Sequence, residues 1–325
     1  MNILIVFNRV IPVTNYGGIQ RAAWWLGKEL VRKGHDVTYL VAQGSYCEFA
    51  KIIFYNPDIS LNKQIPDNID VVHLYQYPDE PLKKPYLLHM QSNTKEDKYD
   101  INTVFVSRNH AERHHADCFV YNGIDPEDYG KPDFLKKREN FHFLAKASWK
   151  VKNVKGAIEL AKRTNNKLDV IGGYRINFKM GFRLTLEPSI RFHGMIGGNK
   201  KNAIIGKSKG MIFPVIWHEP FGIAIIESMY FGCPVFGTPY GSLPEIVDLN
   251  SGVLSNKKNE LEYAINHSND FSLNYIHERI MDHFSISIIA KEFLKLYEKV
   301  MNNEKLNKAH PYFDKTSETK YLKFE

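Results

Sequence analysis

The chain has 325 residues and a mass of 37.7 kDa, more than one hydrophobic core usually organises, so two domains are predicted. A content of 43% hydrophobic, 13% aromatic and 24% charged residues excludes the disordered and fibrous classes. The formal net charge of +7 arises from residues 130–167, which contain eleven basic and three acidic residues. This block attracts the phosphates of a nucleotide, a nucleic acid or a lipid headgroup, or is simply a solvated face.

The first half of the chain alternates apolar runs with amphipathic stretches. Residues 2–7 are predicted as a buried strand, 19–33 as a helix and 36–41 as a second strand, which gives a βαβ start. Further strands are expected at 71–74, 86–89, 103–106 and 118–121, with a helix at 107–115. No apolar stretch reaches the length needed to span a bilayer, and the N-terminal run lacks the basic flank of a signal peptide.

A polar segment at 125–139 separates this half from a second alternating half. Strands are expected there at 141–145, 168–171, 190–193, 210–214 and 234–237, and helices at 154–163, 200–208, 221–230, 259–266 and 285–301. We therefore predict an α/β protein with domains at 1–134 and 135–301, and a polar tail at 302–325 that packs on the first domain or extends from it. Two parallel sheets facing a central cleft would place the ligand site at their carboxyl ends.

The most informative motif lies at residues 217–229, where Glu219 is followed by Pro220, Phe221 and Gly222 and, eight positions on, by Glu227. The motif follows a strand and opens a predicted helix, whose free amide groups and dipole favour a diphosphate. The alternative for Glu219 is a structural carboxylate that only interacts with the positive end of the helix dipole. Glu227 falls beside an apolar stripe, so a polar partner is expected for it, and a structural ion pair is the alternative.

This Glu, seven residues, Glu pattern resembles the signature of retaining glycosyltransferase family 4, which has the GT-B fold with two Rossmann-like domains. Residues 16–21 resemble that family's glycine loop, and residues 33–37 its entry to the second strand. Residues 120–125 resemble the element before the interdomain linker, and residues 232–235 with 241–245 the segment after the second Glu. The resemblance covers about residues 1–300, with the Glu motif as its most specific part.

The resemblance implies an acceptor-binding first domain and a second domain that binds a nucleotide-sugar. Glu219 would lie near the transferred sugar and Glu227 would hold ribose hydroxyls. Backbone amides toward sugar and phosphate would come from Phe221, Gly222, Ile223 and Ala224, and from Gly17 and Gly18 of the first domain. Ile196, after His193, would sit at the base-binding corner, where the histidine itself has a structural role as its alternative.

The family's phosphate-binding Arg and Lys correspond here to Lys146 and Lys152, and replacing the Arg with Lys loses a bidentate contact. Either His89 or Gln91 corresponds to the family's histidine beside the sugar, and both remain open. Ser242 and Glu245 have the spacing of a capping box, which predicts a helix start.

No Asp-x-Asp motif and no Cys spacing typical of metal sites occurs in the sequence, so no metal and no cofactor are expected. The resemblance implies a retaining hexosyltransferase that uses a UDP- or GDP-sugar and a glycan or lipid-linked acceptor, in polysaccharide or lipopolysaccharide biosynthesis. The three cysteines, Cys47, Cys118 and Cys233, have no close pair and favour a reducing cytoplasm. An anionic membrane surface on its inner face is a further expected partner. The alternatives are a GT-B-like nucleotide-sugar epimerase and a non-enzymatic nucleic-acid-binding protein.

Overall fold

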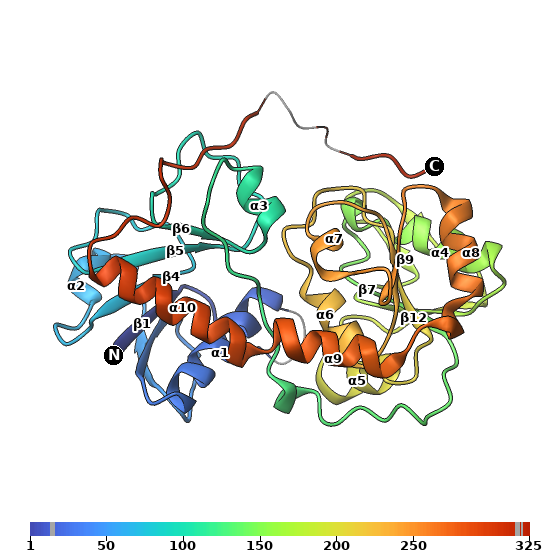
Figure 1. Cartoon of the computed structure of the whole chain (residues 1–325), viewed down its shortest axis with the longest axis horizontal. Coiled ribbons are helices and arrows are strands. Elements are labelled where there is room, and N and C mark those ends of the chain that lie inside the picture. The colour runs from blue at the N-terminus through green and yellow to red at the C-terminus, as the bar shows by residue number, and fades with distance from the viewer. Residues whose placement is uncertain (14–16, 316–318, 320) are drawn as a thin grey trace. The chain divides into compact units, whose positions relative to one another are not determined.

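The computed structural model describes residues 1–13, 17–315, 319 and 321–325, and it divides into two compact units (Figure 1). Unit 1 contains the described residues of 1–13, 17–125 and 284–315, and unit 2 contains 126–283 with 319 and 321–325. Each unit is built on one parallel six-stranded sheet with helices on it.

The sheet of unit 1 has the strand order β3-β2-β1-β4-β5-β6. Its central strand β1 is apolar from Ile3 to Phe7 and is buried on both faces, as expected for a parallel strand covered by helices. The elements of unit 1 are β1 (Asn2–Phe7), α1 (Gly18–Arg32), β2 (Asp36–Val41), β3 (Lys51–Phe54), α2 (Leu61–Gln64), β4 (Val71–Leu74), β5 (Tyr86–Met90), β6 (Thr103–Phe105), α3 (Arg108–Glu112) and α10 (Ile286–Met301).

The sheet of unit 2 has the order β11-β8-β7-β12-β13-β14, which repeats the connectivity of unit 1 and is the strand order of a Rossmann fold. Its elements are η1 (Pro126–Asp128), β7 (Phe141–Leu144), η2 (Lys150–Lys152), α4 (Val154–Arg163), β8 (Leu168–Ile171), β9 (Ile176–Asn177), β10 (Arg183–Leu184), β11 (Ile190–Phe192), α5 (Gly198–Ile205), β12 (Gly210–Phe213), α6 (Ile223–Tyr230), β13 (Val235–Gly237), α7 (Leu243–Ile246), β14 (Gly252–Leu254), α8 (Lys258–Asn266), η3 (Ser268–Asp270) and α9 (Leu273–Phe284). Within the described ranges no helix is long and apolar enough to cross a membrane.

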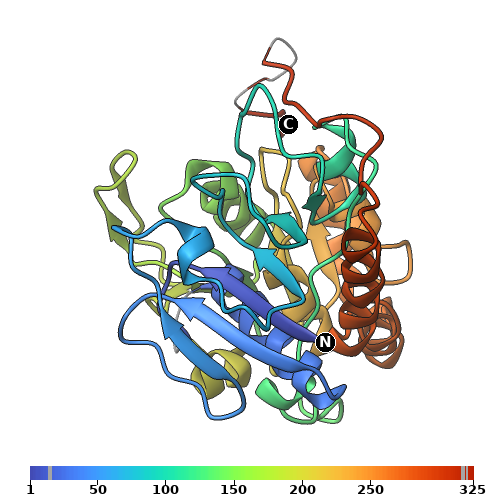
Figure 2. The ribbon, with the colours of Figure 1, turned by 90° about the vertical axis from the view of Figure 1, so that its left-hand side faces the viewer.

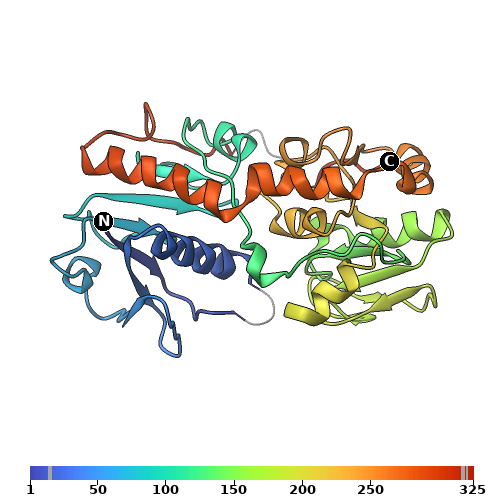
Figure 3. The same ribbon diagram turned by 60° about the horizontal axis from the view of Figure 1, so that its bottom comes forward.

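The compact units depart from the ranges expected from the sequence at two places. The first boundary falls at Asp125/Pro126 rather than after residue 134. The helix α10, expected in the second domain, packs on α1, β4 and β5 of unit 1 (Figure 3), because its buried face carries Ile289, Phe293 and Tyr297. The tail is shared: Phe313 enters the core of unit 1, whereas Leu322 donates its amide to Ile216 of unit 2.

One expectation about local structure was wrong, and several elements were not predicted. Residues 118–121 form no regular strand, since the only bridge recorded there joins Phe119 to Phe105. The short elements β3, α2, β9, β10 and β14, and the longer helix α9, were not predicted. Strands and helices of two to four residues carry too few positions for a periodic signal, but α9 is twelve residues long and was simply missed.

A buried polar chain crosses the interior of unit 1 beneath α10. Gln91 donates to His89 Nε2 (2.9 Å), His89 Nδ1 lies 3.1 Å from His73 Nε2, and His73 Nδ1 lies 2.7 Å from the Tyr297 hydroxyl. A single direction of donation, from Gln91 to Tyr297, gives all four ring nitrogens a partner with both imidazoles neutral. Burial lowers the pKa of His89 to about 3 and also lowers that of His73, since a charged ring there would lose its hydration.

Because these histidines are buried in the neutral form, we expect the free energy of unfolding to fall as the pH is lowered. An unfolded histidine takes up a proton below about pH 6.5, while buried neutral His89 does not until about pH 3, so stability present above pH 6.5 is lost as the pH falls. Each such histidine contributes a slope of about 1.4 kcal/mol per pH unit. Urea unfolding followed between pH 7.5 and 5 should show this slope. The slope of the unfolding free energy against pH should be smaller in His89→Gln than in the wild type. The control His310→Gln, at an exposed histidine, should keep the wild-type slope. Equal slopes in all three proteins would contradict the prediction.

Candidate functional site

The first cluster of site residues joins Glu219, Lys152 and Trp217 in unit 2. Lys152 Nζ lies 2.5 Å from Glu219 Oε2, and the indole N–H of Trp217 donates to the same oxygen at 2.8 Å. Both charged residues are buried, with relative exposures of 8% for Lys152 and 6% for Glu219. The ammonium also lies over the Trp217 ring, 4.9 Å from its centroid. The carboxylate predicted from the motif is therefore held by a cation and an aromatic donor.

Adjacent strands bring these side chains together. Lys152 follows β7 and Glu219 follows β12, which are neighbours in the sheet, so both residues emerge at the carboxyl edge where parallel sheets bind ligands. Two hydrogen bonds join the loops: Ile216 donates its amide to Val151 (2.9 Å), and the Asn153 side-chain amide donates to the Pro214 carbonyl (2.9 Å). Asn153 also caps α4 by accepting from the Gly156 amide at 3.0 Å.

A turn at Gly241 and Ser242 supports the backbone of this cluster. Gly241 has φ +66°, and a Cβ there would overlap the backbone nitrogen and oxygen of Glu219. Ser242 donates its amide to the Glu219 carbonyl (3.0 Å) and its hydroxyl to the Phe221 carbonyl (2.5 Å). The expected helix start is present as α7, but Ser242 does not cap it through its side chain, because that hydroxyl is directed to the 219–221 segment instead.

Gly241→Ala is expected to lower the free energy of unfolding by about 2–4 kcal/mol and to reduce turnover, because it combines left-handed strain with displacement of the Glu219 backbone. Gly130 supplies a matched control, since its φ of +68° is almost the same and nothing lies within 4 Å of a Cβ there. Gly130→Ala should therefore show the strain alone, about 1 kcal/mol. Thermal unfolding and turnover measured on both variants check this, and equal losses would show that the contact with Glu219 has no role.

The helix α6 begins two residues later than the motif predicts. Gly222 is its N-cap with φ +89°, and helical residues start at Ile223, so Pro220 and the buried Phe221 precede the helix. Gly222, Ile223 and Ala224 are half-buried at this end, whereas the Ile225 amide is already bonded to the Gly222 carbonyl (2.8 Å). The amides available for a phosphate are thus those of the first helical residues.

The second cluster surrounds Glu227, for which a polar partner was expected. Its Oε1 lies 2.5 Å from Lys201 Nζ of α5 and accepts from the Tyr129 hydroxyl at 2.5 Å. Glu227 and Lys201 are 5% and 3% exposed, and the ammonium also lies 5.2 Å from the Tyr129 ring centroid. Sequence reasoning missed Lys201, Tyr129 and Trp217; only Trp217, two residues before Glu219, lies inside the motif that drew attention to the site.

The other donor-site candidates of unit 2 occupy the same edge of the sheet. Lys146 follows β7 and lies over the ring of Trp149, 5.3 Å from its centroid. Ile196 follows β11 and is half-buried. His193 Nε2 lies at hydrogen-bond distance, 2.7 Å, from Asp169 Oδ1, so its anchoring is structural.

The site residues predicted in unit 1 lie partly at the start of α1 and partly at the end of β5. Gly17 caps α1 and Gly18 opens it, while Tyr16, the first residue of the expected glycine loop, lies outside the described residues. His89 is 2% exposed and both its ring nitrogens have protein partners, so we no longer assign it a catalytic role. Gln91 is half-buried and exchanges two hydrogen bonds with Asn122. Among the residues that the structure describes, no group of three His, Cys, Asp or Glu could hold a metal ion.

Solved structures identify the fold. The chain superposes on AviGT4, a glycosyltransferase involved in avilamycin A biosynthesis, with a TM-score of 0.76 and 17% identity over 93% of this chain and 98% of that one. It superposes on sucrose-phosphate synthase from Thermosynechococcus elongatus with a TM-score of 0.68 and 15% identity, covering 93% and 100%. HepE of Anabaena, solved with UDP-glucose, gives a TM-score of 0.67 and 13% identity, covering 92% and 100%. Two parallel six-stranded sheets with this topology are the GT-B fold.

The family comparison concerns the unit that carries both clusters. Residues 126–279 match the family model described as glycosyl transferases group 1, a match that spans just under half of the chain. The matched region contains both Glu219 and Glu227, and the superpositions show the GT-B fold. A comparison with curated protein sequences finds no significant match.

Proposed function

We propose that the protein is a retaining glycosyltransferase of family 4 that transfers a hexose from a UDP- or GDP-sugar to a hydroxyl of a glycan or lipid-linked acceptor, without a metal. The observation that carries this proposal is the buried Lys152, Glu219 and Trp217 cluster at the carboxyl edge of the unit 2 sheet. Nucleotide complexes among similar structures add support: HepE is solved with UDP-glucose and with UDP, and starch synthase IV of Arabidopsis with ADP and acarbose.

In this proposal Lys152 has two tasks. One of its three N–H donors orients Glu219, and the ammonium can donate others to the leaving diphosphate, whose charge grows as the anomeric C–O bond breaks. Lys146 and the first amides of α6 would bind the same phosphates. Lysine charge then takes the place of a divalent metal.

Glu219 would accept a hydrogen bond from the transferred sugar, and Glu227 would accept from ribose hydroxyls, with Ile196 beside the base. The acceptor hydroxyl attacks the anomeric carbon on the face that the diphosphate leaves. Its proton passes to the departing diphosphate oxygen as the new C–O bond forms, so the anomeric configuration is retained and no protein nucleophile is required. We place this reaction in the cytoplasm or at the inner membrane face, in polysaccharide or lipopolysaccharide synthesis.

Donor binding and product analysis test the proposal. UDP, GDP, ADP, CMP and their common sugars, all with EDTA, should include one nucleotide series that raises the melting temperature of the wild type and has much less effect on Glu227→Ala. The matching sugar, incubated with and without acceptor glycans, should give an α-linked product from an α-linked donor. Epimerised sugar formed without an acceptor would indicate an epimerase. A larger response to random DNA than to any nucleotide-sugar would indicate nucleic-acid binding.

A further inference from the structure

A β-hairpin with an exposed apolar face projects from unit 2 between β8 and β11. Its strands β9 and β10 pair antiparallel, with Arg183 opposite Asn177 and Leu184 opposite Ile176. From residue 174 to 186 every second residue is apolar, and all of these side chains are exposed: Tyr174, Ile176, Phe178, Met180, Phe182, Leu184 and Leu186. Phe178 and Leu186 are each 78% exposed. Figure 2 shows this hairpin, in yellow-green, standing away from the body of its unit.

On the opposite face of the hairpin, Arg183 and Thr185 pack inward. Arg183 is 7% exposed, donates to the Thr185 hydroxyl (2.9 Å) and to the Tyr174 carbonyl (2.9 Å), and lies 4.8 Å from the Phe192 ring centroid. Arg175 donates to the carbonyls of Thr185, Glu187 and Ile190 at 2.6–3.1 Å. Turning the hairpin over would bury the apolar side chains but would separate Arg183 from the Phe192 ring and Arg175 from the carbonyls of Glu187 and Ile190. These contacts therefore hold the apolar face outward.

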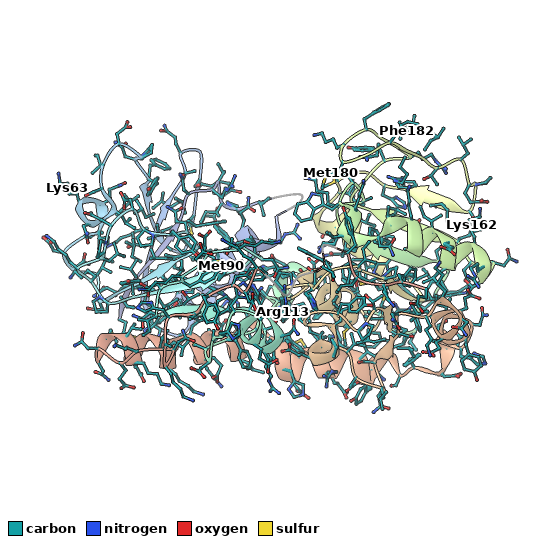
Figure 4. The ribbon with its side chains drawn as sticks, turned by 90° about the horizontal axis from the view of Figure 1, so that it is seen from above. Lys63, Met90, Arg113, Lys162, Met180 and Phe182 are labelled. Atoms are coloured by element: carbon teal, nitrogen blue, oxygen red, sulfur yellow. The ribbon has the colours of Figure 1, made fainter. Side chains whose placement is uncertain are left out.

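Lysines border this apolar face. Lys150 and Lys155 line a cavity of about 340 Å³ together with Met180 and Phe182 of the hairpin. Lys162 lines a second one, of about 450 Å³, with Leu184 and Leu186. Figure 4 shows Met180 and Phe182 at the outer edge of unit 2 and Lys162 on α4 nearby. Lys179 lies exposed at the hairpin tip itself. The hairpin thus adjoins part of the basic block of residues 130–167.

We propose that this hairpin face is a membrane-docking surface for a bilayer that contains anionic lipid. Contiguous exposed apolar side chains mark an interaction surface. Phe178, Met180 and Phe182 would enter the boundary between headgroups and acyl chains, while the adjoining lysines meet anionic headgroups. A second copy of the chain fits less well, because a symmetric contact through the same face would bring the same lysines together. The surface goes beyond the proposed sugar transfer and does not depend on it.

Co-sedimentation of the full-length protein with lipid vesicles tests this. The wild type should sediment with phosphatidylcholine vesicles that contain phosphatidylglycerol, more weakly with phosphatidylcholine alone, and less at high salt. Phe178→Ser/Phe182→Ser should weaken this binding by at least about tenfold, since two large apolar side chains no longer enter the bilayer. The control Leu135→Ser/Leu249→Ser removes two leucines that are 97% and 93% exposed elsewhere in unit 2, and it should bind vesicles like the wild type.

Three outcomes would overturn the proposal: no sedimentation of the wild type, equal sedimentation of both double variants, or a dimer in light scattering that the hairpin variant converts to monomer without any vesicle binding. The last outcome assigns the face to self-association. The melting shift with nucleotide, measured on the same samples, shows that the hairpin variant is folded. If no nucleotide stabilises the wild type, the proposed sugar transfer fails, while the vesicle result still decides the docking surface.

Discussion

Lys152→Met is expected to lower kcat by about 10²- to 10³-fold, because it removes the cation that would stabilise the leaving diphosphate in a buried site. It should also lower the free energy of unfolding by about 3–5 kcal/mol, since Glu219 would stay buried without its counter-ion. Steady-state kinetics with the nucleotide-sugar that gives turnover, together with urea unfolding, measure the two effects.

Two further variants separate these effects. Lys152→Met/Glu219→Gln removes both charges, so it should recover most of the stability but none of the activity. Lys257→Met takes the cation from an exposed Lys–Glu pair of the same unit, 3.0 Å in length, and should leave the free energy of unfolding almost unchanged, because solvent screens such a pair. Full kcat in the folded double variant would show that the Lys152–Glu219 pair is only structural.

Glu227→Gln is expected to weaken binding of the preferred ribonucleoside diphosphate by about 10- to 100-fold, because hydrogen bonds from ribose hydroxyls to a carboxylate are stronger than those to a neutral amide. The 2′-deoxy analogue should already bind more weakly to the wild type and should lose much less affinity in the variant. Calorimetric titration of both nucleotides into both proteins gives the four dissociation constants.

The competing interpretation is that Lys201 and Tyr129 pair with Glu227 only to hold η1 and α5 against α6. In that case Glu227→Gln would weaken the ribo- and deoxyribonucleotide to the same extent. Lys201→Met should lower the unfolding free energy by about 3–5 kcal/mol under either interpretation, since the pair is buried. Its stability change therefore does not discriminate, whereas the ratio of the two affinities does. Glu260→Gln, at an exposed pair, should leave both affinities unchanged.

The site was predicted from local sequence to the extent that its residues are close along the chain. The strand before Glu219 and the eight-residue spacing to Glu227 depend on apolar runs that lie within one segment. The partners of these carboxylates depend on distant residues: Lys152 is 67 positions from Glu219, and Tyr129 is 98 from Glu227. No periodic pattern links residues that far apart, because their contact results from strand order.

The choice between His89 and Gln91 also depended on a distant part of the chain. The two residues are two positions apart at the end of β5. Because successive side chains of a strand alternate between its faces, the sequence predicts that both lie on the same face. Only α10, returning from residues 286–301 to cover that face, encloses His89 with His73 and Tyr297. The burial of His89 therefore depends on where α10 packs, and no pattern within residues 86–91 predicts that packing.

By itself the sequence determined the α/β class, most of the long elements, the Glu219 and Glu227 motif and the basic block, because hydrophobic periodicity and short spacings are local properties. Only the tertiary structure decided where the units divide, which cations and aromatic groups hold each carboxylate, and which face of the hairpin points outward. The alternation from Tyr174 to Leu186 predicts two faces equally well. The contact of buried Arg183 with the Phe192 ring, and the hydrogen bonds of Arg175 to the carbonyls of Glu187 and Ile190, select the apolar face for exposure, because a buried guanidinium group requires partners.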